Sequence, residues 1–184
     1  MTEADANANA DLAALVRTIA DHPRPGILFR DVSTLLLDGW GFRSAIDRLI
    51  ATLDADRIDL IAGIEARGFI VASALSYALT KGKIMLRKSG KLPGEAVGID
   101  YALEYGIDRI EMHVDAVRPG TRVLLVDDLI ATGGTAAAGV GLLRGQGAVV
   151  EEARFLADLP DLGGARKLAA QGVACRALLA FPGH

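Results

Sequence analysis

Residues 123–135, VLLVDDLIATGGT, place two neighbouring acids between a buried strand and a glycine turn. The turn is expected to open a helix, where backbone N–H groups are unpaired and the helix dipole is positive, so an anion is the natural ligand. Glycine lets a phosphate approach the backbone closely, and threonine hydroxyls can donate further hydrogen bonds. The sequence therefore predicts a phosphate site made by Ala131, Thr132, Gly133, Gly134 and Thr135.

The acids Asp127 and Asp128 favour a ligand that carries hydroxyl groups as well as a phosphate. A ribose 5-phosphate does so, because its 2′- and 3′-hydroxyls can donate to the carboxylates. Magnesium bridging the ribose and a pyrophosphate would relieve the remaining charge, since it prefers oxygen ligands. The motif is neither a GxxxxGK phosphate loop nor a GxGxxG dinucleotide loop. An isolated acid pair would more often be a solvated strand end, but the glycine turn that follows favours the sugar phosphate.

A second charged cluster, Arg87, Lys88 and Lys91, occupies the polar stretch RKSGKLPGE. Such a cluster is usually a solvated surface, but at the end of a strand it can form a lid that covers an anion. Arg67 lies between another strand and the next helix, where the helix dipole would repel it unless an anion binds. A guanidinium suits a forked anion, although an ion pair with Glu65 is the structural alternative.

The composition is that of an ordinary soluble domain of 184 residues, just over half of them apolar. A net charge of −3 disfavours nonspecific binding to nucleic acid or to an anionic membrane. No apolar run approaches the ~20 residues that cross a bilayer, and the acidic N-terminus does not resemble a signal peptide. Cys175 is the only cysteine, so no internal disulfide can form, and a cytoplasmic protein is expected.

Strand-type and helix-type segments alternate along most of the chain, which we interpret as one domain spanning 1–184. Residues 1–9 are low in complexity and expected to be poorly ordered, 89–98 show no evident regular structure, and 100–105 with 108–114 predict an antiparallel hairpin around Gly106. Strands are expected at 58–64, 83–88, 121–128, 149–159 and 173–181, and helices at 10–20, 41–54, 68–79, 134–147 and 165–172.

Apolar strands separated by helices predict an α/β fold with a mostly parallel sheet covered on both faces. Ligands bind such sheets beyond the carboxyl ends of the strands. The candidate site segments 65–68, 87–95 and 127–135 all follow strands, so we expect them to meet at one edge of the sheet.

The stretch VLLVDDLIATGGT resembles the phosphoribosyl-pyrophosphate (PRPP) motif of the type I phosphoribosyltransferases. Further stretches are similar to the adenine-specific members of that family: RPGILFRDVSTLL (24–36), AGIEARGF (62–69), RKSGKLPGE (87–95) and YALEYG (101–106). The resemblance implies a twisted, mostly parallel sheet flanked by helices. It also implies a small N-terminal hood with a base-binding segment at 21–36, and a lid and hairpin at 89–106.

The implied reaction is transfer of the 5-phosphoribosyl group from PRPP to adenine, which gives AMP and pyrophosphate. The resemblance also implies Mg²⁺ that is carried by PRPP near Asp127 and Asp128, without direct ligation by the protein. It further implies a homodimer in which Arg87 reaches the neighbouring subunit's PRPP. Two alternatives remain open. The chain could use another base (hypoxanthine, guanine, xanthine or orotate), or it could be a non-catalytic PRPP sensor.

The family match assigns a role to each candidate residue. It implies that Glu104 accepts the proton that the attacking base nitrogen loses. The alternative is that Glu104 is a solvent-exposed glutamate of the hairpin without a catalytic role. Arg67 is implied to grip pyrophosphate during the reaction. The implied PRPP and AMP set is Arg67, Arg87, Lys88, Lys91, Tyr105, Asp127, Asp128 and the turn 131–135.

The adenine site is expected on the segment that follows Pro25-Gly26. There the backbone of Leu28 and Arg30 can read the edge of the base, while Phe29 and Leu129 can cover its two faces. Phe29 is equally well explained as an ordinary core aromatic residue.

Overall fold

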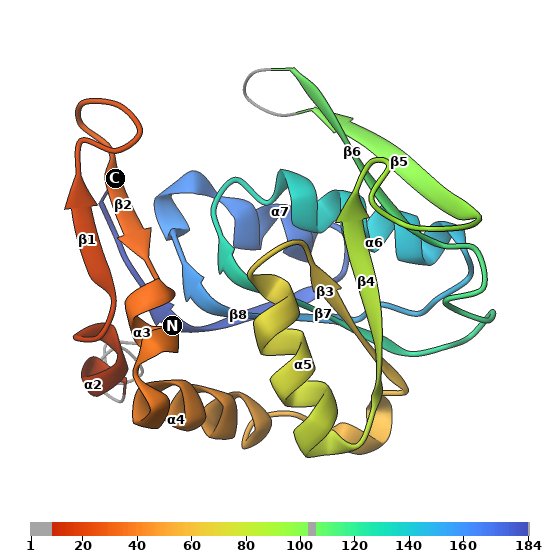
Figure 1. Ribbon diagram of the computed structural model, residues 1–184, viewed down its shortest axis with the longest axis horizontal. Helices are drawn as coiled ribbons and strands as arrows, with labels where there is room; N and C mark the ends of the chain where they lie inside the picture. The colour runs from red at the N-terminus through yellow and green to blue at the C-terminus, as the bar shows by residue number, and fades with distance from the viewer. Residues whose placement is uncertain (1–8, 103–105, 184) are drawn as a thin grey trace.

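A seven-stranded sheet forms the centre of the computed structural model, which describes residues 9–102 and 106–183 (Figure 1). Its strand order is β5-β6-β4-β3-β7-β8-β9. The five neighbouring strands β4, β3, β7, β8 and β9 run parallel to one another. Strands β5 and β6 form an antiparallel pair at one edge, where β6 joins β4. The strands are β3 (Leu60–Ile64), β4 (Gly82–Lys88), β5 (Ala96–Ala102), β6 (Ile107–His113), β7 (Val123–Ile130), β8 (Glu152–Asp158) and β9 (Ala174–Ala180).

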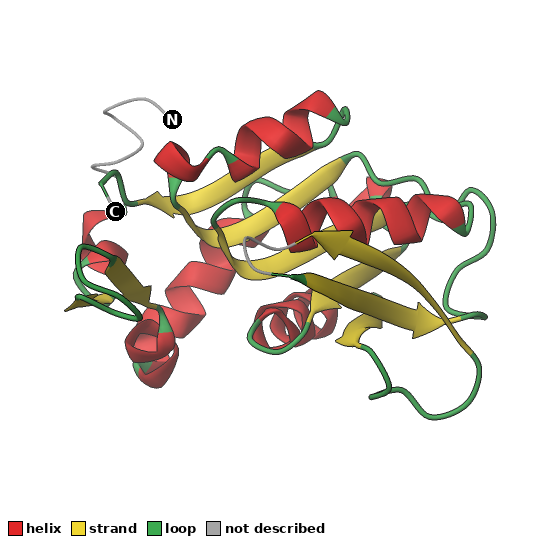
Figure 2. Ribbon diagram, turned by 90° about the horizontal axis from the view of Figure 1, so that it is seen from above, coloured by secondary structure: helices red, strands yellow, loops and turns green. Residues whose placement is uncertain are grey.

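Helices cover both faces of this sheet, as a parallel sheet requires (Figure 2). One buried cluster lies between the sheet and α6 and includes Phe155, Leu125 and Leu143. A second cluster lies on the opposite face under α4 and α5 and includes Leu156 and Leu75. The helices are α4 (Gly39–Ile50), α5 (Gly68–Leu79), α6 (Gly134–Gly145) and α7 (Gly164–Ala170), with short 3₁₀ turns η1 (Ala55–Arg57) and η2 (Pro160–Leu162).

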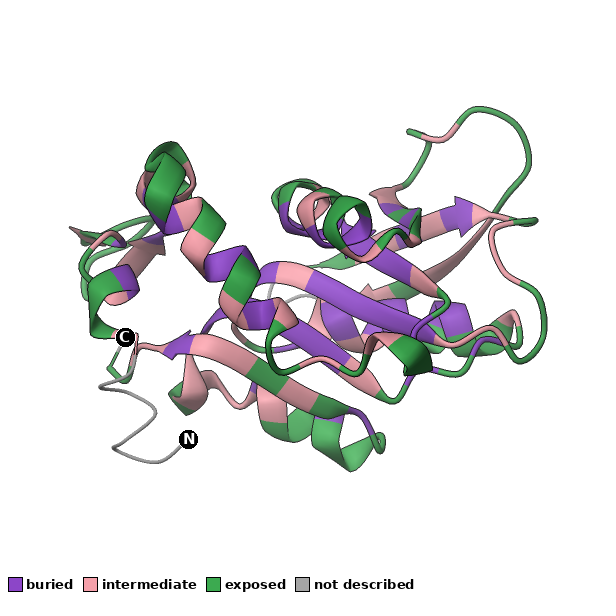
Figure 3. Ribbon diagram, turned by 90° about the horizontal axis from the view of Figure 1, so that it is seen from below, coloured by how far each residue is buried: buried purple, intermediate pink, exposed green. Residues whose placement is uncertain are grey.

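Successive side chains of the central strands point alternately to the two faces of the sheet, which explains why both faces carry a buried core. In β7, Leu124 and Val126 pack into the second cluster, whereas Val123 and Leu125 pack into the first. Figure 3 shows the buried positions concentrated in the central strands. The predicted mostly parallel α/β fold is confirmed, and every strand and helix expected from residue 41 onward is present with its ends shifted by a few residues.

A separate N-terminal unit, here called the hood, comprises α2 (Ala10–Ala13), β1 (Arg17–Ala20), β2 (Leu28–Asp31) and α3 (Ser33–Leu37). The expected helix over 10–20 is wrong beyond Ala13. Residues 17–20 form a strand that pairs antiparallel with β2, and Arg17 donates from Nη2 to Asp31 Oδ2 at 2.5 Å. That pairing with a second segment of the chain overrides the local helical spacing of apolar side chains.

The predicted hairpin is confirmed, with Ala102 paired to Ile107, but it is longer than expected. Its first strand begins at Ala96, inside the stretch 89–98 in which no regular structure was expected. Val97 and Ile99 explain the difference, because their side chains pack against the core cluster beneath α6. The hairpin is therefore attached to the body of the protein along β5.

Near the N-terminus, the described part of the chain begins at Asn9. Of the stretch 1–9, expected to be poorly ordered, Asn9 is described, and its Nδ2 donates to the carbonyl of Leu178 at 2.8 Å. Residues 1–8 lie outside the described part. In residues 9–102 and 106–183, no helix combines the length and apolar character needed to span a bilayer.

Candidate active site

A cavity of about 400 Å³ opens at the carboxyl ends of β3 and β7. Segments from three parts of the chain line it, as the parallel topology predicts. The expected site segments 65–68, 87–95 and 127–135 therefore do meet, each contributing at least one residue. The lining consists of Ile64, Glu65, Ala66, Arg67, Lys88 and residues 127–136.

The predicted phosphate turn forms one wall of the cavity and leads into α6. Gly133 is the residue before the helix and has a φ of 72°, in the left-handed region that glycine adopts readily. A Cβ at Gly133 would lie 2.8 Å from Cα of Gly164, at the start of α7. The carbonyl of Ala131 accepts a hydrogen bond from the N–H of Gly164 at 2.9 Å, so α7 holds the turn in place.

The twin aspartates lie near the end of β7, and both line the cavity. The backbone N–H of Asp128 donates to Asp127 Oδ1 at 2.8 Å. Asp128 is buried, with 5% of its surface exposed, and Oδ2 accepts a hydrogen bond from Arg67 Nε at 2.5 Å. The sequence left open whether Arg67 pairs with Glu65, and the structure pairs it with Asp128. The residue predicted to grip pyrophosphate thus contacts a residue predicted to hold ribose.

Asp127 lies against the start of α5. A Cβ at Gly68 would lie 2.6 Å from Asp127 Oδ1, so only glycine allows this helix to approach so closely. Burial, followed by the negative charge of Asp128, raises the pKa of Asp127 well above its ordinary value. A hydroxyl donor or a cation arriving in the cavity would relieve this unfavourable charge.

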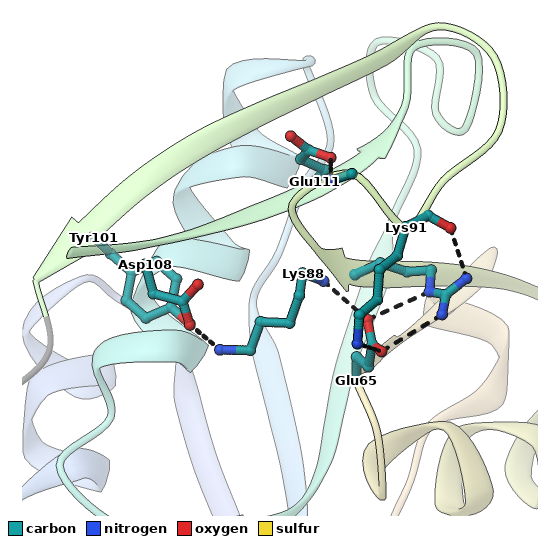
Figure 4. A network of polar contacts seen from close by, with 8 residues as sticks. Glu65, Lys88, Lys91, Tyr101, Asp108 and Glu111 are labelled. Atoms are coloured by element: carbon teal, nitrogen blue, oxygen red, sulfur yellow. Dashed lines mark hydrogen bonds and ion pairs between the residues drawn. The ribbon is translucent and has the colours of Figure 1, made fainter. Parts of the chain in front are cut away.

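The turn between β3 and α5 carries Glu65, Ala66 and Arg67, and the peptide bond between Glu65 and Ala66 is cis. Glu65 Oε1 accepts from Lys91 Nζ at 2.8 Å, and its Oε2 accepts from Arg87 Nε at 3.3 Å (Figure 4). Two of the predicted lid cations are thus held by an acid of the cavity wall. Arg87 and Lys91 do not belong to the described lining of the cavity, whereas Lys88 does.

The side chain of Lys88 is bonded to the hairpin, whereas its backbone N–H donates to Glu65 of the cavity wall at 2.9 Å. Its Nζ pairs with the carboxylate of Asp108 and lies 3.1 Å from Tyr101 Oη (Figure 4). The Tyr101 hydroxyl also accepts from Thr135 Oγ1 at 3.3 Å, which connects the hairpin to the phosphate turn. Glu104 and Tyr105, predicted to act on the base and to line the closed site, lie outside the described residues.

The predicted adenine residues are divided between two places. Leu129 lines the cavity, whereas Leu28, Phe29 and Arg30 lie on β2 of the hood and are absent from the described lining. Leu129 packs against the same buried cluster as Val32 of the hood, so the hood adjoins this side of the site. The predicted contacts of these residues with the base stay a prediction.

Three further residues of the site were missed in the sequence. Glu65 was considered only as a partner of Arg67, and Tyr101 was quoted only as part of YALEYG. Phe181, at the end of β9, lies under Arg30 with 5.1 Å between the ring centre and Cζ. No local pattern identifies these roles, because at least one partner of each residue lies more than 20 residues away in the sequence.

Among the described carboxylates that line the cavity, Asp127 and Asp128 are neighbours, whereas Glu65 is bonded to Arg87, Lys88 and Lys91. Within residues 9–102 and 106–183, no group of three or more His, Cys, Asp or Glu side chains has the geometry to hold a metal ion. Asp127 and Asp128 suit an oxygen-preferring ion that brings most of its ligands from a substrate and from water. The residues therefore fit Mg²⁺ carried into the site by PRPP.

Comparison with known proteins gives the same assignment. The model of the phosphoribosyl transferase domain family matches residues 34–160. An adenine phosphoribosyltransferase of a Bradyrhizobium species is 59% identical over 174 residues, which cover 95% of this chain and 97% of the relative. One from a Chelativorans species is 58% identical and covers 94% and 96% of the two chains.

Solved structures agree with the sequence relatives. Adenine phosphoribosyltransferase from Thermoanaerobacter pseudethanolicus has a TM-score of 0.88 and 41% identity, over 94% of this chain and 99% of that one. The Saccharomyces cerevisiae enzyme, in complex with an imino-altritol bisphosphate and adenine, has a TM-score of 0.84 and 34% identity, over 95% and 99%. With the family model, the relatives and the fold in agreement, this chain belongs to the adenine phosphoribosyltransferase family.

Proposed function

We propose that the protein transfers the 5-phosphoribosyl group of PRPP to N9 of adenine, forming AMP and pyrophosphate in purine salvage. The bond from C1′ of the ribose to the pyrophosphate oxygen breaks, and a bond from C1′ to N9 forms. The proton of N9 must leave, and pyrophosphate departs with the electrons of the broken bond. The site must therefore hold the ribose 5-phosphate, neutralise pyrophosphate and accept one proton.

One observation carries this proposal: the cavity brings the acid pair, the glycine turn and Arg67 together. A phosphate bound at the start of α6 would accept hydrogen bonds from free backbone N–H groups. The 2′- and 3′-hydroxyl groups of the ribose would then lie near Asp127 and Asp128, which precede the turn in the chain. Close relatives that are named for this activity support the same assignment.

Arg67 and the lid cations have the charge that pyrophosphate requires. Arg67 lies on the cavity wall, and Lys88, at the end of β4, lines the same cavity. Lys91 would join them by leaving Glu65, and Arg87 would leave Glu65 to reach the PRPP of the neighbouring subunit in the proposed homodimer. Guanidinium and ammonium groups placed around the departing oxygen atoms stabilise the charge that develops as the C1′–O bond breaks.

Glu104 is proposed as the group that accepts the N9 proton, and Tyr105 as a residue that helps to cover the closed site. Both belong to the connection between β5 and β6. The described ends of that hairpin, Ala102 and Ile107, are paired next to the phosphate turn. A Cβ at Gly134 would be 3.5 Å from the Ala102 carbonyl, so the connection starts within reach of a nucleotide bound there.

The hood is proposed to recognise adenine. The main chain of Leu28 would accept from N6 and that of Arg30 would donate to N1, with Phe29 and Leu129 on the two faces of the base. Arg30 is held in the hood by a bond from Nη1 to Thr18 Oγ1 at 2.6 Å. Main-chain groups held in this way suit the alternating donor and acceptor pattern of adenine and require no charged side chain.

Mg²⁺ is proposed to enter with PRPP, near Asp127 and Asp128. When bound, it would neutralise pyrophosphate oxygen atoms and help to order the ribose. The chain's own residues then have the remaining tasks of orienting the sugar, holding the phosphate and excluding water.

The test is incubation of the purified protein with PRPP, Mg²⁺ and one base at a time. We expect AMP from adenine and no nucleotide from hypoxanthine, guanine, xanthine or orotate. Turnover of another base instead of adenine would reject the proposed specificity. PRPP binding without turnover of any base would identify a PRPP sensor.

A homodimer is proposed as the working assembly. Apolar side chains on one side of α5 and β4 support it, because Tyr77 is 91% exposed and Ile70 and Met85 are also exposed. Light scattering after size exclusion should give twice the mass of one chain. A monomeric mass at micromolar concentration would reject this proposal.

The cytoplasm is proposed as the place of action. The single Cys175 supports this, since the fold has no internal disulfide that an oxidising compartment would form. Cell fractionation with an antibody to the protein would test it, and recovery in a membrane or secreted fraction would contradict it.

A further inference from the structure

The carboxylate of Glu65 collects three donors from the segment that carries the lid cations (Figure 4). Lys91 Nζ lies 2.8 Å from Oε1, while Arg87 Nε and the backbone N–H of Lys88 lie 3.3 and 2.9 Å from Oε2. The Glu65 side chain is only 11% exposed and lines the cavity two residues before Arg67. One acid thus occupies the place where these cations converge.

This carboxylate is negatively charged at neutral pH. Burial by itself raises the pKa of Glu65, but hydrogen bonds from Lys91, the Lys88 backbone and Arg87 outweigh burial and lower the pKa to about 2. A permanent negative charge therefore stands beside the wall where Arg67 is proposed to hold pyrophosphate.

A pyrophosphate that enters this part of the cavity meets an acid already bonded to the cations it needs. Either Arg87 and Lys91 leave Glu65, or they stay and the polyanion lies close to a like charge. Both outcomes weaken binding, because the first breaks existing ion pairs and the second adds repulsion.

We propose that Glu65 is a positioning residue that competes with pyrophosphate for Arg87 and Lys91, and so favours release of that product. It keeps the lid cations beside the cavity when no polyanion is present and takes them back when pyrophosphate leaves. This inference rests on the proposed function, since it assumes that pyrophosphate binds next to Arg67.

The exposure of the cations suits such an exchange. The Lys91 side chain is 52% exposed and that of Arg87 is 29% exposed. Water can solvate the half-exposed Lys91 ammonium as it leaves Glu65, so its exchange costs less than that of the more buried Arg87. The Lys88 backbone bond to Glu65 would remain during the exchange, because it involves the main chain of β4.

The experiment is calorimetric titration of Glu65→Gln and of the unaltered protein with pyrophosphate in the presence of Mg²⁺. The amide keeps the shape and still accepts from the Lys88 backbone, but it lacks the charge. We expect pyrophosphate to bind about 3- to 10-fold more tightly to Glu65→Gln, as is typical of removing one nearby like charge. AMP affinity should change less than about twofold in the same protein.

Glu111→Gln is the matched control. Glu111 also accepts a main-chain N–H of this segment, that of Gly90 at 2.9 Å, but its ion-pair partner is Arg109. Its pyrophosphate affinity should equal that of the unaltered protein. Glu65→Asp, which keeps the charge, should bind pyrophosphate more weakly than Glu65→Gln.

A gain of affinity cannot come from a damaged fold, so tighter binding to Glu65→Gln supports competition. Equal or weaker binding of pyrophosphate, with AMP binding retained, overturns this inference and leaves the proposed function intact. If neither protein binds pyrophosphate or AMP, the proposed function fails and the role of Glu65 fails with it.

Discussion

Arg67 donates from Nε to Oδ2 of Asp128 at a distance of 2.5 Å, although 61 residues separate them in the sequence. Asp128 is almost fully buried, while the Arg67 side chain is 45% exposed on the cavity wall. The two residues are proposed to serve different parts of PRPP, pyrophosphate and ribose. Without a ligand they neutralise each other, and the lid cations are likewise paired with Glu65 and Asp108. Each of these four cations is therefore already paired with an acid before PRPP arrives.

Asp128→Asn should raise KM for PRPP about 10- to 100-fold, because a hydrogen bond to a charged group contributes about 1.5–3 kcal/mol. KM for adenine and the melting temperature should change little. Steady-state kinetics with each substrate varied in turn would measure this. Asp47→Asn is the control, since Asp47 is an exposed acid paired with Arg43 on α4. An unchanged KM for PRPP in Asp128→Asn would reject the ribose role.

Glu104→Gln should reduce kcat about 10²- to 10⁴-fold, the usual contribution of a positioned proton acceptor. KM for PRPP should change much less, because the residue is proposed to act on the base rather than on the sugar phosphate. Initial rates and direct binding of PRPP would separate the two effects. Equal losses in turnover and in PRPP affinity would argue against work on the base.

Gly133→Ala should destabilise the protein and weaken AMP binding. The residue has a φ of 72°, and a Cβ there would lie 2.8 Å from Gly164 Cα. A left-handed backbone costs a non-glycine residue about 1–3 kcal/mol, and each kcal/mol lowers the melting temperature of a domain this size by roughly 2–4 °C. Thermal unfolding and AMP titration would measure both effects.

Gly134→Ala is the comparison for that variant. The nearest atom to its Cβ, leaving out its chain neighbours, is the Ala102 carbonyl oxygen at 3.5 Å, which is an ordinary contact. It should retain the melting temperature while losing AMP affinity, because the methyl group stands in the phosphate turn. If Gly134→Ala bound AMP normally, the phosphate would have to bind elsewhere.

Asp31→Asn should make the free energy of unfolding less dependent on pH in the acidic range. A hydrogen bond from Arg17, and then bonds from Ser33, lower the pKa of Asp31 to about 2. An unfolded chain protonates this group near pH 4. Its stabilising contribution is therefore complete above about pH 4 and is lost as the pH falls towards 2, where the unfolded state binds more protons.

Urea unfolding at pH 7, 4 and 3 would test this expectation. The free energy of unfolding should fall less between pH 4 and pH 3 in Asp31→Asn than in the unaltered protein. Asp47→Asn should follow the unaltered protein, because its acid is exposed. Identical pH dependence in all three proteins would show that the Arg17–Asp31 pair does not stabilise the hood.

Phe181→Leu should raise KM for adenine about two- to fivefold, because a cation–π contact at a partly exposed site contributes about 0.5–1 kcal/mol. The ring lies under the Arg30 guanidinium and so helps to hold β2, the proposed adenine-reading strand. KM for PRPP should not change, and Phe181→Tyr should behave as the unaltered protein. A rise in both KM values would indicate a general loss of structure instead.

The sequence by itself determined the fold class, most strands and helices of the central sheet, and the composition of the phosphate turn. These features depend on local patterns: apolar runs of strand length, helical spacing, and glycines before a helix. The hood was predicted least well. The helical spacing at 10–20 gave way to the pairing of β1 with β2, which local spacing cannot reveal.

Only the tertiary structure decided which charged residue pairs with which. The sequence suggested Glu65 as the alternative partner of Arg67, and the fold placed Asp128 against it instead. Glu65 instead received Arg87 and Lys91 from the next strand. Ion pairs depend on distances of a few ångströms between side chains, and such distances are set by how strands and helices pack rather than by their order in the chain.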